Sequence, residues 1–449
     1  MRLACIGPLS PLRTGVAHFS ESWLPYLAKR CDIKLFTAGY ALSATPILRR
    51  FPASDISEFV SDPSAFDAVL YHMGNHYLYH QRIFDTLCRV PGMVILHDCV
   101  LNPFFAKYAL ERGNFGMFRR LFDLCYGDSF HEEADLFCKA TGDPYRFPMA
   151  GVTAMCSRGT LVMNEYARRI VSKEAPVARV LTIRHPYFGV PAPSEPVCDL
   201  RRKFSIPENH FVVISIGHMT PAKRIDVTLD AFRKFNEEFP DALLLLAGEP
   251  SAQVPLNEMI ERGSLENVRY LGYLRDEEFN ELLELADICI NLRYPSNGEM
   301  SGTLIHALGR GKVAVVSNYA QFAEFPDELC VKIDLGPNES DDLARNLLLL
   351  ARERERLISI GEAARSYIVE NHSPDAVANT LVEIMQSHAS AEPPLSSGDI
   401  EDMLLPDPFL RRSGQRFAYN VKRLFAYQRE FGMIQMLREV IRRSQANAR

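Results

Sequence analysis

The sequence lacks several patterns that would assign it to common protein classes. Its ten cysteines include no Cys-x-x-Cys pair, and several lie inside apolar runs as buried free thiols do. A disulfide framework is therefore not indicated, and a reducing compartment is expected. No apolar run approaches the ~18 residues that a membrane span needs. The formal net charge of −6 argues against a dedicated nucleic-acid binder. We expect a cytoplasmic protein, with peripheral contact at the inner face of a membrane left open.

Two motifs with a known mechanism are also absent. No Gly-x-Gly-x-x-Gly follows the first expected strand, so a dinucleotide-binding fingerprint is not supported. No Asp-x-Asp stands where a metal-dependent transferase would need one. His76 and His80 lie one helical turn apart, but no nearby Glu or Cys completes a set of metal ligands. We expect no metal and no cofactor.

The length of 449 residues is too great for one core, and two domains are expected. Short apolar strands bounded by turn residues alternate with helices in both halves of the chain. Such alternation is typical of doubly wound α/β sheets. The expected strands span residues 3–6, 33–36, 68–71, 93–96, 152–156 and 180–183, then 211–216, 242–247, 268–271, 288–292 and 313–316.

One stretch of the second half combines a carboxylate with a helix start. After the strand 288–292, Glu299 is followed at once by Ser301-Gly302-Thr303. A helix N-terminus offers free backbone N–H groups and the positive end of a dipole, and Gly302 lets an anion approach them. A carboxylate for hydroxyls beside a cradle for phosphates suits a phosphorylated sugar. The alternative is an ordinary capped helix after a strand.

A second expected anion site follows the strand 211–216. Gly217 stands at the strand end, and Lys223 and Arg224 come at the next helix start. Glycine, cations and a helix N-terminus attract an anion by separate mechanisms, although a solvated surface lysine is the alternative. Gly248 and Gly272 also end strands, so one nucleotide-sized crevice would collect these loops.

In the first half, polar residues follow two neighbouring strands. Ligands in open α/β sheets bind beyond the carboxyl ends of strands, and His72, Asn75, His97 and Asp98 occupy such positions. For His97 we favour a substrate contact. Asp98 is equally well explained as the cap of a helix. Gly15, at the start of the first helix, suits either a phosphate contact or a plain turn.

At these residues the chain resembles the retaining, nucleotide-sugar-dependent glycosyltransferases of the GT-B fold, often called glycosyltransferase family 4 or group 1. The resemblance rests on Gly217-x5-Lys223-Arg224, Leu271-Gly272-Tyr273 and Glu299-x2-Gly302. It implies two Rossmann-like domains facing across a cleft, with the acceptor mostly on the first and the donor on the second. It further implies transfer from a nucleotide diphosphate sugar to a glycan, a lipid-linked acceptor or a cell-surface polysaccharide precursor, with retention of configuration.

The resemblance also implies roles for single residues. Lys223 would neutralise the donor diphosphate, Glu299 would hold hydroxyls of the transferred sugar, and His97 would lie near the sugar. Two positions depart from the family: His218 replaces an arginine, and the second glutamate, expected beside His306 and Ala307, is absent. The other implied donor-binding residues are Gly15, Gly217, His218, Arg224, Gly272, Tyr273, Arg293, Ser301, Gly302 and Thr303, and the acceptor-side candidates are Asn75, His76 and Asp98.

The missing glutamate keeps a non-catalytic binding or scaffold protein open, and a GT-B sugar-nucleotide epimerase remains an alternative. The C-terminal segment carries about ten Lys or Arg against two Glu and has apolar residues at helical spacing. It would lie on an anionic membrane or pack on the acidic body. The expected parts are 1–190, an acceptor-side domain; 191–208, a linker; 209–388, the nucleotide-sugar domain; 389–408, a linker; and 409–449, a basic amphipathic helical tail.

Overall fold

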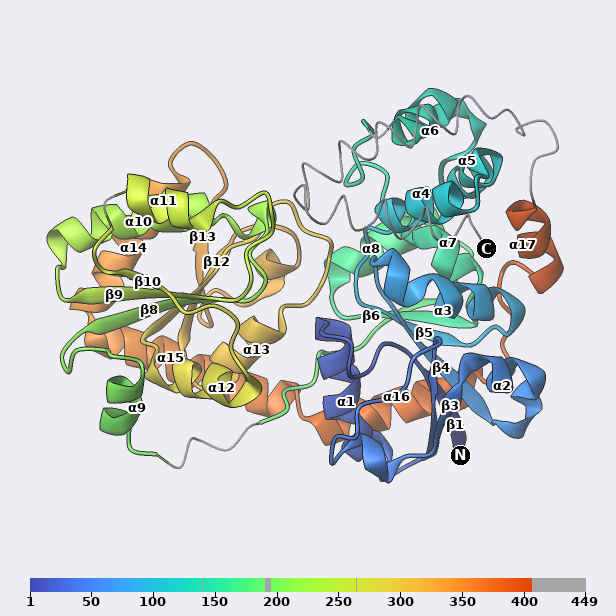
Figure 1. The fold of residues 1–449 in the computed structure, drawn as a ribbon, viewed down its shortest axis with the longest axis horizontal. Coiled ribbons are helices and arrows are strands. Elements are labelled where there is room, and N and C mark those ends of the chain that lie inside the picture. The colour runs from blue at the N-terminus through green and yellow to red at the C-terminus, as the bar shows by residue number, and fades with distance from the viewer. Residues whose placement is uncertain (140, 190–194, 264, 406–449) are drawn as a thin grey trace, which may run out of the picture. The chain divides into compact units, whose positions relative to one another are not determined.

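The computed structural model describes residues 1–139, 141–189, 195–263 and 265–405 (Figure 1). The chain divides into two compact units. Unit 1 takes in Met1–Pro186, Asn297–Met300 and the described residues from Ser373 onward, and unit 2 takes in Tyr187–Ser296 and Ser301–His372. The expected tail, 409–449, lies outside the described residues.

Unit 1 is built on a seven-stranded parallel sheet in the order β3-β2-β1-β4-β5-β6-β7. Helices cover both faces, with α1 and α16 on one and α3, α4 and α7 on the other (Figure 1). The strands are β1 Arg2–Ile6, β2 Asp32–Thr37, β3 Ala53–Asp55, β4 Ala68–Met73, β5 Met93–Leu96, β6 Gly159–Val162 and β7 Val180–Thr182. The helices are α1 Gly15–Leu27, α2 Ile56–Ser61, α3 Tyr77–Arg89, α4 Asn102–Glu111, α5 Phe115–Tyr126, α6 His131–Cys138, α7 Ala150–Met155, α8 Glu165–Glu174, α16 Pro374–His388 and α17 Ser397–Leu404.

Unit 2 repeats this plan with a six-stranded parallel sheet in the order β10-β9-β8-β11-β12-β13. In Figure 1, α10, α11 and α14 cover one face, and α9, α12, α13 and α15 cover the other. The strands are β8 Phe211–Ile216, β9 Ala242–Ala247, β10 Val268–Tyr270, β11 Ile288–Asn291, β12 Val313–Ser317 and β13 Val331–Ile333. The helices are α9 Val197–Lys203, α10 Ile225–Glu238, α11 Leu256–Arg262, α12 Asp276–Leu285, α13 Gly302–Gly309, α14 Glu339–Arg352 and α15 Arg354–Asn371.

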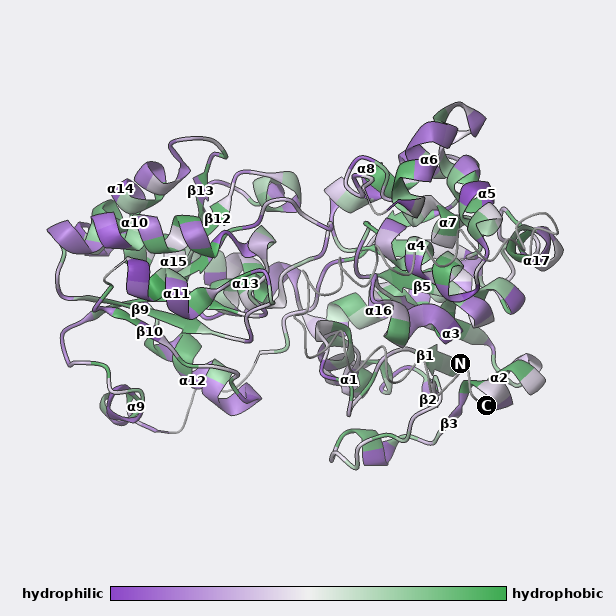
Figure 2. Cartoon of the chain, turned by 45° about the horizontal axis from the view of Figure 1, so that its top comes forward, coloured by the Kyte–Doolittle hydropathy of each residue, from purple (hydrophilic) through white to green (hydrophobic). Residues whose placement is uncertain are grey.

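Burial on both faces explains why the central strands are apolar throughout. Every residue of β8, β9 and β11 is buried, as parallel strands covered by helices require. In Figure 2 the hydrophobic strand β9 contrasts with the hydrophilic residues on the covering helices α10 and α14. The doubly wound α/β class expected from the sequence is confirmed by both sheets.

The segment 152–156, expected as a strand, is part of helix α7 instead. The strand that pairs with β5 is β6, which begins at Gly159. Glu174 accounts for the difference, because its buried carboxylate accepts hydrogen bonds from the backbone N–H groups of Met149 and Gly151 at the start of α7. A carboxylate there satisfies helix-end donors and favours a helix. This partner is 23 residues away from Gly151 in the chain.

The domain boundaries in the structure differ from the expected ones. Helix α16, expected in the second domain, packs on α1 in unit 1. There Asp375 accepts from Lys29 and Arg30 at 2.9 and 3.1 Å. The expected linkers also contain helices: α9 lies within 191–208 and α17 within 389–408. Leu395 donates to the Met155 carbonyl, so the second of these segments is attached to unit 1.

Two glycines let the carboxyl ends of β8 and β9 approach closely. Gly248 has φ +118°, and a Cβ at this position would lie 2.3 Å from the Gly217 carbonyl oxygen. Its N–H donates to the Gly272 carbonyl oxygen at 2.7 Å. Only glycine combines this backbone conformation with this approach.

We expect Gly248→Ala to destabilise the protein by about 2–4 kcal/mol, because left-handed strain and a clash with backbone add. Gly272→Ala is the matched control: Gly272 has φ +72° but nothing within 4 Å of the added Cβ, so about 1 kcal/mol is expected. Urea unfolding followed by circular dichroism measures both. Equal losses in the two variants would show that the close approach to Gly217 is unimportant.

Candidate functional site

The expected anion-binding residues of unit 2 lie on the loops that follow β8 and β11. These strands are neighbours at the centre of the sheet, where the strand order reverses. Such a topological switch point opens a crevice in doubly wound folds. After β8 the chain bends through Gly217, and the Lys223 ammonium donates to the Ile216 carbonyl oxygen at 2.6 Å. The Lys223 charge therefore lies at the carboxyl end of the central strand.

The start of α13 lies after the neighbouring strand β11. Ser301 caps this helix: its hydroxyl accepts from the Leu304 N–H and donates to the Asn291 side-chain oxygen at 3.0 Å. Because Asn291 ends β11, this bond fixes the first turn of α13 to the strand end. Gly302 and Thr303 form that turn and are half-buried, so their N–H groups present the positive end of the helix.

The two loops are tied together by a backbone hydrogen bond. The Tyr294 N–H donates to the Ala222 carbonyl oxygen at 2.8 Å, next to Lys223. Arg293, one residue earlier, is 8% exposed and its N–H donates to the Ser317 hydroxyl. The structure thus brings Lys223, Arg293 and the α13 turn to one edge of the sheet.

Arg224, also expected to bind the donor, already has an acidic partner. Its guanidinium pairs with Glu339, whose side chain is 2% exposed, and this pair raises the pKa of Arg224. Removing one member of such a pair would leave a buried charge uncompensated. Arg224 therefore has a structural task besides any contact with a donor.

The remaining donor-side candidates lie on the same edge. Gly272 follows β10, and Tyr273 after it is 55% exposed. His218 follows β8 and is exposed; it stands where the family that the sequence resembles has an arginine. These side chains are accessible to a ligand at the carboxyl ends of β8 and β10.

The position of the missing second glutamate lies inside the fold. Ala307 is fully buried, and His306 packs against the rings of Tyr187 and Phe279 at 5.7 and 6.0 Å. A carboxylate in this place would have to be buried among apolar groups. The buried, largely apolar environment of His306 and Ala307 is therefore unsuited to a charged glutamate.

Glu299 belongs by its contacts to unit 1, with the segment Asn297–Met300. The Cys99 N–H donates to the Asn297 carbonyl oxygen at 2.7 Å, and the Asn164 amide donates to the Gly298 carbonyl oxygen at 2.8 Å. The Glu299 carboxylate accepts from the Asn297 N–H at 3.0 Å. These bonds hold the segment of Glu299 against the loop after β5. The contact with this loop is at Cys99, two residues after His97 in the chain.

Sequence reasoning missed Cys99 and Asn164 as the residues that fix this loop. Asn164 caps α8 by accepting from the Ala167 N–H, and its amide group makes the bond to Gly298. An Asn before a helix signals a cap, but no local pattern shows that its amide reaches residue 298. A Cβ at Gly298 would lie 2.2 Å from the Cys99 sulfur, so this position requires glycine.

The polar residues at the ends of β4 and β5 lie close together in unit 1. His72 is inside β4 rather than after it, and its Nδ1 lies 3.1 Å from Nε2 of His97. The His97 N–H donates to the Met73 carbonyl oxygen. Asp98 does not cap the following helix α4; its carboxylate accepts from the Asn75 N–H at 3.1 Å. The loops after β4 and β5 are therefore joined by this hydrogen bond.

Two candidates stand further from this group. His76 precedes α3, and its ring stacks on Tyr79 with centroids 4.2 Å apart. Gly15 begins α1 and is exposed, with nothing within 4 Å of an added Cβ. In the part of the chain that the structure describes, no three His, Cys, Asp or Glu residues are grouped as a metal ion would require.

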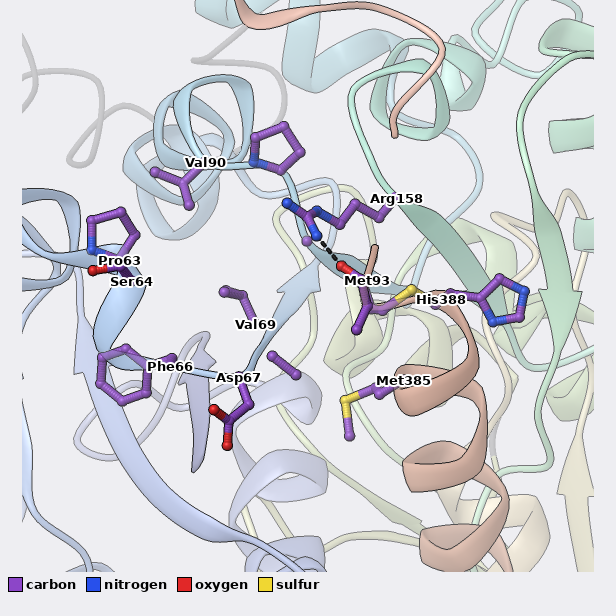
Figure 3. Close-up of a pocket in the computed structure, with 14 residues that line it drawn as sticks. Pro63, Ser64, Phe66, Asp67, Val69, Val90, Met93, Arg158, Met385 and His388 are labelled. Carbon is purple, nitrogen blue, oxygen red and sulfur yellow. Dashed lines mark hydrogen bonds between the residues drawn. The ribbon is translucent and has the colours of Figure 1, made fainter. Parts of the chain in front are cut away.

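A cavity of about 320 Å³ lies at the opposite edge of the same sheet (Figure 3). Val69 and Met93 line it near the amino ends of β4 and β5, and Met385 and His388 line it from α16. Arg158 also reaches it and donates to the Ala389 carbonyl oxygen. Because His72 and His97 are at the carboxyl ends, this cavity is not the candidate site.

Part of the chain is similar to a family of known proteins. A model of the family described as "Glycosyl transferases group 1" matches residues 198–367. The uncharacterized glycosyltransferase YqgM of Bacillus subtilis (strain 168) is 21% identical over 393 residues, 86% of this chain and 98% of that protein. The alpha-monoglucosyldiacylglycerol synthase of Acholeplasma laidlawii is 23% identical over 181 residues, 40% of this chain and 44% of that protein.

Solved structures show the same architecture. Anabaena Alr3699/HepE in complex with UDP superposes with a TM-score of 0.63 at 14% identity, covering 86% of this chain and 100% of that one. WaaG, a glycosyltransferase involved in lipopolysaccharide biosynthesis, gives 0.58 at 14% identity, covering 86% and 99%. The chain has the GT-B fold, and its residues 198–367 are similar to the group 1 glycosyl transferases. Within its described residues, no helix is both long and apolar enough to cross a membrane.

The histidines of unit 1 generate a prediction about pH. Burial lowers the pKa of His72 to about 3 and of His80 to about 4, and it lowers the pKa of His97 well below its usual value. At a pH below about 6.5, the pKa of histidine in the unfolded chain, the unfolded chain binds protons at these imidazoles and the native state does not. The stability of unit 1 should therefore fall as the pH drops from about 6.5 towards 4, by up to about 1.4 kcal/mol per pH unit for each imidazole.

Trp23 makes this measurable, because it is the one tryptophan of the sequence and is 1% exposed in α1. Denaturant unfolding followed by its fluorescence at pH 7.5, 6.5 and 5.5 gives the slope. His80→Gln, which cannot be protonated, should make the slope clearly shallower. A slope that this substitution leaves unchanged would contradict the assignment.

Proposed function

We propose that the protein is a retaining glycosyltransferase of family 4 type, which transfers a hexose from a nucleotide diphosphate sugar to an acceptor hydroxyl. One observation carries this proposal: Lys223 and the N-terminal turn of α13 flank the switch point of a domain that matches the group 1 glycosyl transferases. A lysine and free helix N–H groups are what a diphosphate requires.

In this mechanism the diphosphate is stabilised as it leaves. Negative charge develops on the leaving oxygen, and preorganised donors aimed at it lower the barrier. Lys223 would supply a full charge, while Gly302 and Thr303 would supply N–H groups. The chain's own donors are sufficient for this task, so we propose no metal ion and no cofactor.

Glu299 and His97 would act on the sugar. Glu299 is half-buried and held by the Asn297 N–H, so its carboxylate is positioned to accept hydrogen bonds from sugar hydroxyls. His97 is kept neutral by burial, which lowers its pKa, and would exchange a hydrogen bond with the sugar. None of these residues is assigned the role of a nucleophile for a double displacement. We therefore propose a front-face reaction in which the departing phosphate deprotonates the acceptor hydroxyl.

The relatives suggest the classes of donor and acceptor. Alr3699/HepE was crystallised with UDP and UDP-glucose, and the Acholeplasma enzyme is named for the synthesis of a glucosyldiacylglycerol. A lipopolysaccharide N-acetylglucosaminetransferase of Salmonella typhimurium is 21% identical over 238 residues. We propose a UDP-hexose or a similar donor and a glycan or lipid-linked acceptor at the inner face of a membrane.

Thermal-shift titration with UDP-, GDP-, ADP- and TDP-sugars tests donor binding. We expect one nucleotide class to raise the melting temperature by several degrees. Lys223→Ala should reduce this rise strongly and Glu299→Ala should reduce it for the sugar nucleotide more than for the free nucleotide. Lys173→Ala, at an exposed position of α8, is the matched control. An unchanged shift in Lys223→Ala would reject the diphosphate site.

The stereochemical outcome is a separate test. We expect the proton NMR coupling of the product's anomeric position to match that of the α-linked donor, because the proposed front-face reaction retains the configuration. Turnover in Lys223→Ala should fall about 10²–10³-fold, as expected for loss of a charge that stabilises the transition state. An inverted product would reject the retaining mechanism but leave sugar transfer in place.

A further inference from the structure

Two imidazoles, one of them buried, lie side by side at the carboxyl ends of β4 and β5 in unit 1. His72, near the end of β4, is 1% exposed, whereas His97, just after β5, is half-buried. Their facing nitrogens, Nδ1 of His72 and Nε2 of His97, are 3.1 Å apart, and their rings are inclined by 23°. This distance is that of a hydrogen bond.

The surroundings hold His72 in this place. A Cβ at Gly7 would lie 2.9 Å from the Cβ of His72, so the glycine at the end of β1 makes room for the histidine. Phe19 of α1 packs against both rings in T-shaped arrangements, with its ring centroid 6.0 Å from that of His72 and 5.0 Å from that of His97. The His97 backbone is fixed by its bond to the Met73 carbonyl. Neither ring is therefore free to turn without disturbing the packing.

A hydrogen bond between two neutral imidazoles requires one proton between the facing nitrogens. If His72 donates, Nε2 of His97 accepts and the His97 proton is on Nδ1. If His97 donates, its proton is on Nε2 and its Nδ1 is an acceptor. In both cases the bond to His72 decides which role Nδ1 of His97 can play towards a hydroxyl group.

We propose that His72 is a positioning residue that fixes the ring orientation and the tautomer of His97. The proposal rests on the proposed function in one respect, since it takes His97 to contact the sugar. His72 itself touches no substrate and acts through His97 alone. Hydrogen-bond partners that orient metal-bound histidines change affinity or activity by about 10–100-fold, and we expect an effect of similar size here.

The test compares three variants of the whole chain. His72→Phe keeps a ring but removes the hydrogen bond, and His72→Asn keeps a polar atom near the position of Nδ1. His80→Phe is the matched control: His80 is equally buried, at 2% exposed, but its Nδ1 bonds to the His76 carbonyl rather than to His97. Trp23 fluorescence during denaturant unfolding measures how much each variant destabilises unit 1.

We expect His72→Phe to lower kcat about 10-fold or more while the donor KM changes less than about 2-fold. His72→Asn should recover most of the activity, and His80→Phe should retain kcat even where its stability falls. An equal loss of kcat in His72→Phe and His80→Phe would overturn the proposal, because the effect would then be one of packing.

Nitrogen-15 NMR of labelled histidine side chains is a readout that needs no activity. The resonances of His97, assigned through His97→Gln, should show one tautomer in the native protein and a mixture of tautomers in His72→Phe. Unchanged His97 shifts in His72→Phe would overturn the proposal. If the protein transferred no sugar at all, the proposed function would fail, and the NMR result would still decide whether His72 controls His97.

Discussion

The parallel ladder between β8 and β11 is the contact on which the site of unit 2 depends. Ile288 pairs with Val213 and Cys289 with Ile214, which places the carboxyl ends of two strands side by side although 75 residues separate the partners. Each strand is followed by its own loop and helix start, so the pairing brings Lys223 to the N-terminal turn of α13. Without that ladder, each would be an isolated feature of the surface.

The same arrangement operates in unit 1, where the strand order reverses between β1 and β4. Gly7 ends β1, His72 lies near the end of β4, and His97 follows β5. Here the loops carry neutral imidazoles rather than cations, because burial in this layer opposes charge. The two sheets thus present different chemistry at equivalent edges: cations and helix N–H groups in unit 2, and imidazoles together with the Asp98 carboxylate in unit 1.

Close contacts require glycine at one position in each unit. Gly248 lies against the Gly217 carbonyl, and Gly298 lies against the sulfur of Cys99. In each case a functional loop is placed by a contact that leaves no space for a side chain. Such glycines are recognisable in the sequence as turn formers, but the atom that excludes a Cβ becomes known only from the fold.

The expected structure differed from the observed one where a distant partner decided the outcome. The apolar segment 152–156 has the composition of a strand, yet Glu174 caps it as helix α7. Helix α16 lies in the range expected for the second domain, but it packs on α1, where Asp375 meets Lys29 and Arg30. Arg224 was expected at the phosphate, which remains a prediction, and the structure adds its ion pair with buried Glu339.

The sequence by itself determined the doubly wound α/β class, most strand bounds and the loops that carry Lys223, Glu299 and His97. These follow from local patterns, since apolar runs, glycines and helix starts are adjacent in the chain. Only the tertiary structure decided that His72 bonds to His97, that Asn164 holds the loop of Glu299, and that Arg224 is already paired. Each of these depends on groups brought together by strand pairing and packing, and no spacing along the chain encodes such a meeting.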